Sequence, residues 1–436
     1  MQVLPKLCDA KKIAACGKYN VLPMYCEMLS DFTTPMETLR MLKNVSTHCY
    51  LLESARADET WGRYTFLGFD PKMELTCING EMKVGDLTFH TDQPSVYIRR
   101  VLDAYKSPRL EGLPPFTGGF VGYFSYDYVG YAEPCIKRTV QDTEQFKDVD
   151  LMLFDRVIAF DHVRQKIILI VNISLNDIDT GYNHGMMQLR QLCDLIRNGK
   201  KKREDGGKIK GEITPLFDRK SFCEMVKKAK AHIREGDIFQ IVLSNRFSAP
   251  FSGSLLNTYR VLRTINPSPY MFYFSGTDVE VAGASPETLV KLENGVLSTF
   301  PLAGTKPRGK TQAEDEQRQR ELLHDEKELA EHDMLVDLGR NDLGKISKFG
   351  SVRVEQLHQI ERFSHVMHIG STVRGEIRED CDALDAIQAV LPAGTLSGAP
   401  KIRACQLIAE MENNKRGIYG GAIGYQRTCY LFRRAV

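Results

Sequence analysis

The sequence contains no apolar stretch long enough to cross a membrane. Residues 1–20 contain no apolar core of signal-peptide length, and no later run approaches the roughly 18 apolar residues that a spanning helix needs. These absences argue against a helical membrane protein, and we expect a protein that stays in the cytosol.

A strong charge of either sign is also missing. The 58 Lys and Arg residues nearly balance the 56 Asp and Glu residues, so that the formal net charge is +2. Proteins that bind nucleic acid or anionic membranes usually carry an excess of basic residues. The balance therefore argues against a polyanion-binding role.

The motifs of metal clusters and dinucleotide folds are absent too. Eleven cysteines occur singly, from Cys8 to Cys429, and no two form a C-x-x-C pair. This spacing predicts neither a zinc cluster nor a disulfide framework, and we expect reduced, mostly buried thiols. Neither a G-x-G-x-x-G motif nor a repeat of fixed period is present, which argues against a dinucleotide-binding fold and against a repeat protein.

The length of 436 residues exceeds what one ordinary core fills, so two lobes and one large interleaved body both remain possible. Residues 198–211, NGKKKREDGGKIKG, are charged, contain glycine and are almost free of large apolar side chains, which predicts an exposed connection. We accordingly divide the chain into an N-terminal region, residues 1–200, and a second region, residues 212–436.

Apolar periodicity and turn residues predict helices and strands in mixed order. Helices are expected at 186–197, 218–235, 315–338, 382–390 and 399–411, and strands at 121–123, 157–160, 166–171 and 238–247.

The first candidate functional residues are a pair of carboxylates on one predicted helix. Glu328 and Glu331 are three positions apart and share a helix face, whereas Asp333 and Asp337 are displaced from it. Such a pair suits a hard cation such as Mg²⁺, or divides into one ligand and one general acid. A solvated acidic face is the alternative interpretation.

Three neighbouring segments favour a functional site over that alternative. Residues 339–342 (GRND) resemble a capped helix end with a fixed cation, and His365 and His368 fall on a strand-like run. Each feature alone is ordinary, but together they supply anion donors, a titratable ring and metal ligands for a small substrate with several carboxylates. The third segment, a glycine-rich turn before a helix, supplies Gly394, Thr395, Gly398 and Lys401.

These residues resemble a family, the chorismate-utilising enzymes, and within it the large subunits of anthranilate synthases. The resemblance covers nearly the whole chain, and it implies an α+β fold in which two facing, mostly antiparallel β-sheets carry helices on the outside. The matching runs are LLESARADETWGRYTFLG (51–68), NPSPYMFYF (266–274), GASPETLV (283–290), PLAGTKPRG (301–309), ELAEHDMLVDLGRND (328–342), SHVMHIGSTVRG (364–375), PAGTLSGAPK (392–401) and YGGAIGY (419–425).

Two positions distinguish reactions within the family. Aminodeoxychorismate synthases typically carry a nucleophilic Lys where this chain has Ala303. Isochorismate and salicylate synthases typically carry a water-activating Lys where this chain has Gln240, and an amide is no general base near neutral pH. Ammonia, which needs no activation, is therefore the expected nucleophile, and the expected product is anthranilate.

The resemblance also implies a mechanism. Mg²⁺, held in part by Glu331, binds the ring carboxylate of chorismate; ammonia adds at C2, Glu328 protonates the departing C4 hydroxyl, and pyruvate is then eliminated with help from His368. Substrate contacts are implied for Gly304, Thr305, Thr395, Gly398, Gly420, Gly421 and the nearby Lys401, with Gln240 and Ala303 beside the ring.

A regulatory pocket and a partner follow from the same resemblance. In the N-terminal region, Glu53 and Ser54 are expected to bind the ammonium group of tryptophan, an inhibitor, and Pro269, Tyr270 and Met271 to enclose its indole. The chain carries no Cys-His amidotransferase signature, so a separate glutaminase subunit is expected to supply ammonia.

The chain departs from the family after residue 425. The family continues with an Arg-bearing strand, a glycine-rich strand and a helix with another Mg²⁺ ligand, whereas this sequence reads QRTCYLFRRAV. We therefore expect a C-terminally truncated catalytic region with impaired folding and metal binding. Isochorismate or aminodeoxychorismate formation, and a remnant that binds without catalysis, remain alternatives.

Overall fold

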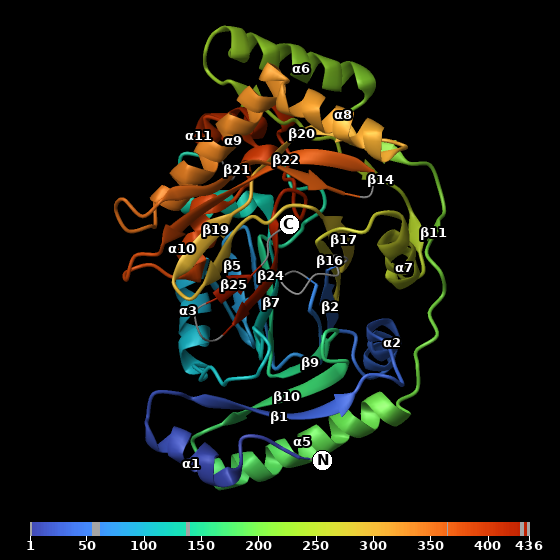
Figure 1. Ribbon diagram of the computed structural model, residues 1–436, viewed down its shortest axis with the longest axis vertical. Coiled ribbons are helices and arrows are strands. Elements are labelled where there is room, and N and C mark those ends of the chain that lie inside the picture. Colours follow the sequence, from blue (N-terminus) through green and yellow to red (C-terminus); the bar gives the residue numbers. More distant parts are fainter. Residues whose placement is uncertain (1, 55–61, 137–139, 364, 428–430, 434–436) are drawn as a thin grey trace.

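The computed structural model describes residues 2–54, 62–136, 140–363, 365–427 and 431–433, with Arg427 and residues 431–433 described by their backbone alone. Two large antiparallel β-sheets form its centre (Figure 1). Cys429, named above among the thiols, lies outside the described residues.

The first sheet has seven strands, and its central strands are buried. Its central strands β9, β3 and β2 are almost continuously apolar, as expected for strands covered on both faces. In spatial order the strands are β1 (Val21–Leu29), β10 (Lys166–Ser174), β9 (Arg156–Asp161), β3 (Tyr64–Phe69), β2 (Cys49–Glu53), β16 (Tyr270–Ser275) and β17 (Glu280–Ser285).

The second sheet has twelve strands and carries the residues of interest at one end. In spatial order they are β20 (Leu302–Pro307), β22 (Val366–Glu376), β19 (Val296–Thr299), β18 (Lys291–Glu293), β25 (Leu431–Arg433), β24 (Ala422–Arg427), β7 (Gly119–Phe124), β8 (Val149–Phe154), β4 (Met73–Ile78), β5 (Glu81–Val84) and β6 (Leu87–His90), while β21 (Arg353–Arg362) pairs with β22.

Helices cover the outer faces of both sheets (Figure 1). The first sheet packs against α1 (Leu7–Ala15), α2 (Pro35–Val45), α5 (Ile178–Asn198) and α7 (Leu256–Ile265). The second packs against α3 (Pro94–Ala104), α9 (Glu326–Gly344) and α10 (Ala383–Val390). Further helices are α4 (Val129–Ala132), α6 (Arg219–Arg234), α8 (Gln312–Leu323), α11 (Lys401–Glu412) and the 3₁₀ turns η1 (Tyr126–Tyr128) and η2 (Gly394–Leu396).

An aromatic core joins the inner faces of the two sheets. Tyr50 and Phe66 of the first sheet pack edge to face with Phe154 and Tyr425 of the second, at ring-centroid distances of 4.7 and 5.7 Å. Such edge-to-face pairs add to the stabilisation that apolar burial provides. The expected α+β class with two facing antiparallel sheets is thereby confirmed.

Each sheet takes strands from both regions into which we divided the chain. Strands β16 and β17 complete the first sheet, and β4 to β8 complete the second. The connection at 198–211 is largely exposed, as predicted, but Glu204 within it forms an ion pair of 2.9 Å with the buried Lys43.

Three predicted elements differ from the structure. The helix expected at 315–338 is two helices, because Asp325 begins α9 as an N-cap that accepts from the backbone N–H of Glu328. The end expected at 339–342 lies inside α9. In place of the strand expected at 238–247 there are two strands of two residues each. Of these, β13 (Gln240–Ile241) pairs with β23 (Gly398–Ala399), and β14 (Phe247–Ser248) pairs with β12 (Thr214–Pro215).

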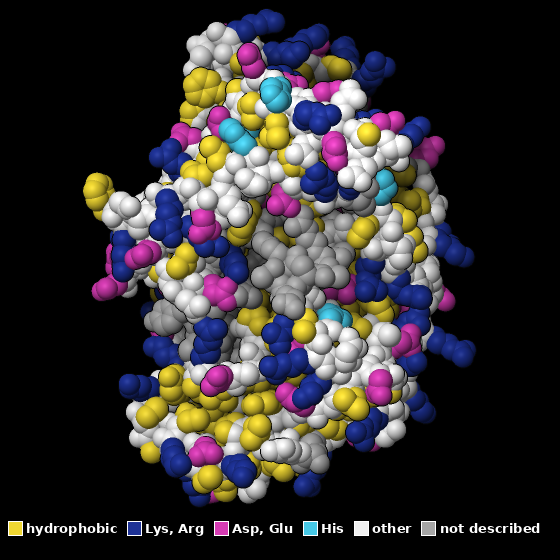
Figure 2. Space-filling model, in the orientation of Figure 1, with side chains coloured by type: hydrophobic (Ala, Val, Ile, Leu, Met, Phe, Trp, Pro, Cys, Tyr) yellow, Lys and Arg dark blue, Asp and Glu magenta, His cyan; other side chains and the backbone are white. Residues whose placement is uncertain are grey.

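The surface carries charges of both signs. Lys and Arg side chains alternate with Asp and Glu over the face shown in Figure 2, in keeping with the small net charge. The expectation of mostly buried thiols was wrong, since four of the ten described cysteines are buried, two are partly buried and four are exposed. Within the described part of the chain, no helix is both long and apolar enough to span a membrane.

Candidate active site

A bulge in strand β20 forms the first part of the site. Gly304 has a φ of 67°, a conformation that favours glycine, and the pairing of β20 with β22 shifts register between Ala303 and Thr305. A Cβ on Gly304 would lie 3.1 Å from Ile369. The bulge frees the backbone N–H of Thr305, which donates to Glu328 Oε2 over 3.3 Å.

His368 lies opposite this bulge, and its surroundings define its tautomer. Its Nδ1 lies 3.1 Å from the carbonyl oxygen of Gly304 and 3.0 Å from the hydroxyl of Thr305. A carbonyl oxygen only accepts, so Nδ1 carries the proton and Nε2 keeps a free lone pair. Burial lowers the pKa of His368, and the contact with Gly304 opposes this effect. The neutral ring is therefore able to accept a proton at Nε2.

Helix α9 presents Glu331 one turn beyond Glu328, on the same face. The side-chain amide of Gln240 donates to Glu331 Oε1 over 2.9 Å, while its carbonyl oxygen is buried without a hydrogen-bond partner among the described residues. Gly398 allows this arrangement, because a Cβ there would lie 2.2 Å from the backbone oxygen of Gln240. Strands β13 and β23 therefore pair closely enough to bring Gln240 to α9.

The residues present fit a Mg²⁺ ion. Glu328 and Glu331 offer carboxylate oxygens from adjacent turns of one helix, and the unpartnered carbonyl oxygen of Gln240 lies beside them. Magnesium prefers such oxygen ligands and usually retains several waters.

Glu287 is a site residue that the sequence interpretation missed. It accepts a hydrogen bond of 2.7 Å from the Thr395 hydroxyl, and both line a small cavity against Gly339 of α9. Burial raises the pKa of Glu287 to about 7, although Thr395 and the charge of Lys401 oppose the shift. A signal was available, since this single acidic residue stands between Pro286 and an apolar run in the quoted motif GASPETLV.

Lys401 lies beneath the site and not on its surface. Its ammonium group donates to Asp342 Oδ2 over 2.5 Å and to the carbonyl oxygen of Val390 over 2.8 Å, and the side chain is 7% exposed. Burial raises the pKa of Asp342, and Lys401 opposes this effect. The pair therefore connects α9, α10 and α11 below the η2 turn.

Gly420 and Gly421 lie where backbone comes too close for a side chain. A Cβ on Gly421 would lie 2.3 Å from the backbone oxygen of Phe124, and Gly420 has a φ of 76°. A Cβ on Gly420 would lie 3.1 Å from Tyr126 and 3.8 Å from Leu396, which is the last residue of η2. This turn therefore adjoins the loop that carries Thr395.

The structure brings most residues of the expected tryptophan pocket together between β2 and β16. Glu53 is opposite Met271 in register, and Tyr270 and Met271 are buried. Glu53 itself accepts 2.6 Å and 2.9 Å hydrogen bonds from Tyr259 and Arg263. Ser54 follows Glu53 directly, whereas Pro269 lines a separate small cavity.

Comparison with known proteins identifies the family of this chain. The family model described as chorismate binding enzyme matches residues 47–428. Anthranilate synthase component 1 of Acetivibrio thermocellus is 42% identical over 429 residues, which cover 96% of this chain and 86% of that protein. The corresponding protein of Aquifex aeolicus is 43% identical, with coverages of 93% and 84%.

Solved structures lead to the same family. Anthranilate synthase component I from Streptococcus pneumoniae superposes with a TM-score of 0.77 at 36% identity, covering 87% of this chain and 84% of that one. The menaquinone-specific isochorismate synthase of Escherichia coli has a TM-score of 0.67 at 16% identity and thus shares the fold. The chain belongs to the chorismate binding enzyme family.

Proposed function

We propose that this chain converts chorismate and ammonia into anthranilate, pyruvate and water, as the large component of an anthranilate synthase. The observation that carries the proposal is that a neutral amide, that of Gln240, is hydrogen-bonded to Glu331, together with the methyl side chain of Ala303 at the bulge. Neither position offers an amine that attacks the ring or activates water, so the nucleophile must arrive as ammonia.

We assign Glu287 as the proton donor to the departing C4 hydroxyl, in place of Glu328. Ammonia forms a bond to C2, the ring double bonds shift, and the C4–O bond breaks as the hydroxyl takes a proton and leaves as water. A carboxyl group whose pKa is about 7 still carries a proton near neutral pH. Glu328 instead accepts from Thr305 and, with Glu331, offers oxygens to a cation.

His368 is suited to the second step. Its Nε2 accepts the proton on C2 while the C3–O bond breaks and the ring becomes aromatic; pyruvate leaves as its enolate, which takes up a proton to give the keto acid. Nδ1 stays bonded to Gly304, so the ring remains oriented as its charge changes. A bound Mg²⁺ would supply positive charge at the ring carboxylate, held by Glu328 and Glu331.

The test is product identity. The purified chain is incubated with chorismate, ammonium and Mg²⁺, and chromatography resolves anthranilate, aminodeoxychorismate and isochorismate. Anthranilate is expected. Either of the other products would overturn the assignment made from Gln240 and Ala303. A folded chain that binds chorismate without turning it over would support the binding-only alternative.

Ammonia supply by a glutaminase subunit is part of the proposal. Relatives named as component 1 imply a second component, and this chain lacks an amidotransferase signature of its own. Adding a purified anthranilate synthase glutaminase component should allow glutamine to replace ammonium. If glutamine remains inactive while ammonium works, this chain does not pair with that component.

Feedback inhibition by tryptophan is proposed on the proximity of Glu53, Ser54 and Met271. Calorimetric titration with tryptophan should show binding that Ser54→Ala weakens. Absence of binding across the micromolar to millimolar range would contradict this part of the proposal and leave the catalytic part untouched.

A further inference from the structure

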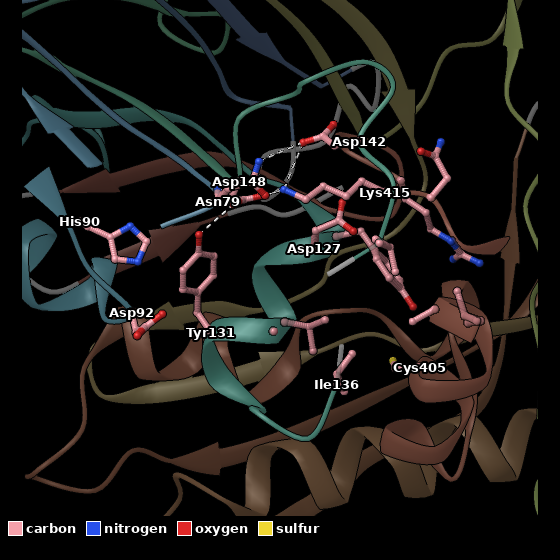
Figure 3. A pocket seen from close by; sticks show the side chains of 18 residues that line it. Asn79, His90, Asp92, Asp127, Tyr131, Ile136, Asp142, Asp148, Cys405 and Lys415 are labelled. Atoms are coloured by element: carbon pink, nitrogen blue, oxygen red, sulfur yellow. Dashed lines mark hydrogen bonds and ion pairs between the residues drawn. The ribbon is translucent and has the colours of Figure 1, made fainter. Parts of the chain in front are cut away.

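A second cavity, of about 470 Å³, contains none of the residues assigned above to catalysis, substrate, metal or tryptophan (Figure 3). It lies between the η1–α4 segment, the second half of α11 and the turn that joins β4 to β5. Its volume is within the usual range for small-molecule sites. One end is polar, and the other is lined by Val129, Ile136 and Ile408.

Most charges at the polar end neutralise one another. Lys415 lies 2.8 Å from Asp148 Oδ1 and 3.4 Å from Asp142 Oδ2, and the Tyr131 hydroxyl donates to Asp148 Oδ2 over 2.8 Å (Figure 3). Arg416 is likewise compensated, because Glu412 accepts from it over 2.6 Å. These groups form a closed network that needs no ligand.

Asp127 is the exception. Its Oδ2 accepts from the backbone N–H of Gly417 over 2.8 Å, but in the described part of the chain no Lys or Arg nitrogen lies within ion-pair distance of it. Burial raises the pKa of Asp127 to about 6; Lys415 and the backbone N–H groups of Gly417 and Arg416 oppose this shift, and Asp148 adds to it. Above that pH the cavity holds a carboxylate that makes no direct ion pair with the described residues, although Lys415 lies near enough to favour its charge.

Tyr126 provides a second, independent sign of a ligand. Its side chain is 5% exposed and lines the cavity, yet its hydroxyl has no hydrogen-bond partner among the described residues. Buried hydroxyl groups normally have one, because an unsatisfied group costs free energy. The hydroxyl lies near the Cys405 thiol, which is at best a weak partner.

We propose that this cavity binds a small organic cation, consisting of a primary ammonium group on an apolar body. The ammonium group would pair with Asp127 and donate to the Tyr126 hydroxyl, while the body contacts Val129, Ile136 and Ile408. A metal ion fits less well: among the described residues, the group with three converging ligand atoms is His232, Glu235 and Asp237, on α6 and just beyond it.

Contacts connect this cavity to the proposed chorismate site. The Arg416 guanidinium lies 4.5 Å from the centre of the Tyr126 ring and donates to the carbonyl oxygens of Leu396 and Val242, each over 2.7 Å. Leu396 adjoins Thr395, and Tyr126 packs under Gly420. If a ligand here changes the affinity for chorismate, linkage requires chorismate to change the affinity for that ligand by the same factor; this consequence rests on the proposed function.

The proposal is tested by direct binding without chorismate, so its outcome is independent of the proposed activity. Benzylamine is the probe and benzyl alcohol its neutral counterpart, both titrated by calorimetry at pH 7.5. Benzylamine should bind on the order of tenfold more tightly than the alcohol, because only the amine pairs with a buried carboxylate. Its affinity should fall as the pH is lowered through about 6, where Asp127 gains a proton.

Two variants locate the site. Asp127→Asn should weaken benzylamine binding by on the order of tenfold, whereas Asp179→Asn, which changes an exposed carboxylate of α5, should not. Tyr126→Phe removes only a hydroxyl whose one neighbour among the described residues is the weakly bonding Cys405 thiol, and so spares the fold; it should weaken binding severalfold. Equal binding of amine and alcohol, no binding of either, or unchanged amine binding in Tyr126→Phe and folded Asp127→Asn would each overturn the proposal.

Discussion

The side-chain amide of Gln240 donates a 2.9 Å hydrogen bond to Glu331, across 91 residues of sequence. The contact places a neutral group where the isochorismate-forming relatives are expected to carry an amine. Because it also leaves one buried oxygen without a partner, it connects the choice of nucleophile with the binding of a cation.

Gln240→Lys should reduce anthranilate formation by about 10- to 100-fold and raise the Mg²⁺ concentration needed for half-maximal rate. A Lys ammonium beside Glu331 forms an ion pair that competes with the metal for the carboxylate. Steady-state rates over a Mg²⁺ series give both values. Gln317→Lys, on the exposed face of α8, is the matched control. An unchanged Mg²⁺ dependence would show that Gln240 is remote from the cation.

Glu331→Gln should abolish most of the Mg²⁺-dependent activity, by about 100-fold or more, because a charged ligand becomes neutral. Asp337→Asn is the control on the same helix, since that carboxylate is exposed and pairs with the exposed Arg340. Calorimetric titration of Mg²⁺ into both variants separates metal binding from catalysis. Equal metal affinity in the two variants would contradict the assignment.

Glu287→Gln should lower the turnover number by about 100- to 10,000-fold, the usual range for loss of a general acid. In the wild-type chain the rate should fall as the pH rises through about 7, where Glu287 loses its proton, and the variant should lack this limb. If the rate of Glu287→Gln still falls as the pH rises through about 7, a residue other than Glu287 is the general acid.

The same carboxyl group should make stability depend on pH. Its folded-state pKa of about 7 lies above the ordinary value of 4.5, so between these values unfolding releases a proton. The contribution to folding is therefore complete below about pH 4.5 and is lost as the pH rises to 7. Urea denaturation should give the wild-type chain a larger free energy of unfolding at pH 5.5 than at pH 8. In Glu287→Gln the difference between the two values should be smaller.

His368→Asn should reduce turnover by at least about 100-fold with little change in stability. The Asn amide can still donate to the carbonyl oxygen of Gly304, as Nδ1 does, but it provides no base. Turnover numbers and thermal denaturation distinguish the two effects. A variant that keeps most of its turnover would show that another group takes the C2 proton.

Gly398→Ala should destabilise the fold by on the order of 2–4 kcal/mol and weaken Mg²⁺ binding. The new Cβ would lie 2.2 Å from the backbone oxygen of Gln240, at a φ of 145°. Gly344→Ala at the end of α9 meets no atom within 4 Å and should be neutral. Urea denaturation of both variants measures the difference; similar losses would contradict the close approach of β13 and β23.

Much of the fold was predictable because it depends on local patterns. Asp218 and Asp382 cap α6 and α10 close to the predicted boundaries, and apolar runs predicted β7, β9 and β10. The strand expected after Ile238 failed for a tertiary reason: its backbone pairs for two residues with β23 and then diverges to contact Glu412, which accepts from the backbone N–H of Ser244 over 2.7 Å.

The candidate site was predictable to a similar extent. Spacing alone placed Glu328 and Glu331 on one helix face, and neighbouring segments singled out His368 and Thr395, whose roles the resemblance supplied. Glu287 escaped notice because a single acidic residue near a strand end has no distinctive spacing. Its raised pKa arises only from burial against α9 and η2, which the sequence does not display.

The sequence by itself determined the family, the pair of carboxylates on α9, and the amide and methyl side chains at positions 240 and 303. The tertiary structure alone decided which atoms meet. The bulge at Gly304 turns the N–H of Thr305 to Glu328, the pairing of β13 with β23 brings Gln240 to Glu331, and Tyr126 and Asp127 come to enclose a cavity behind Gly420. These contacts join residues far apart in the chain, and such contacts leave no periodic pattern in the sequence.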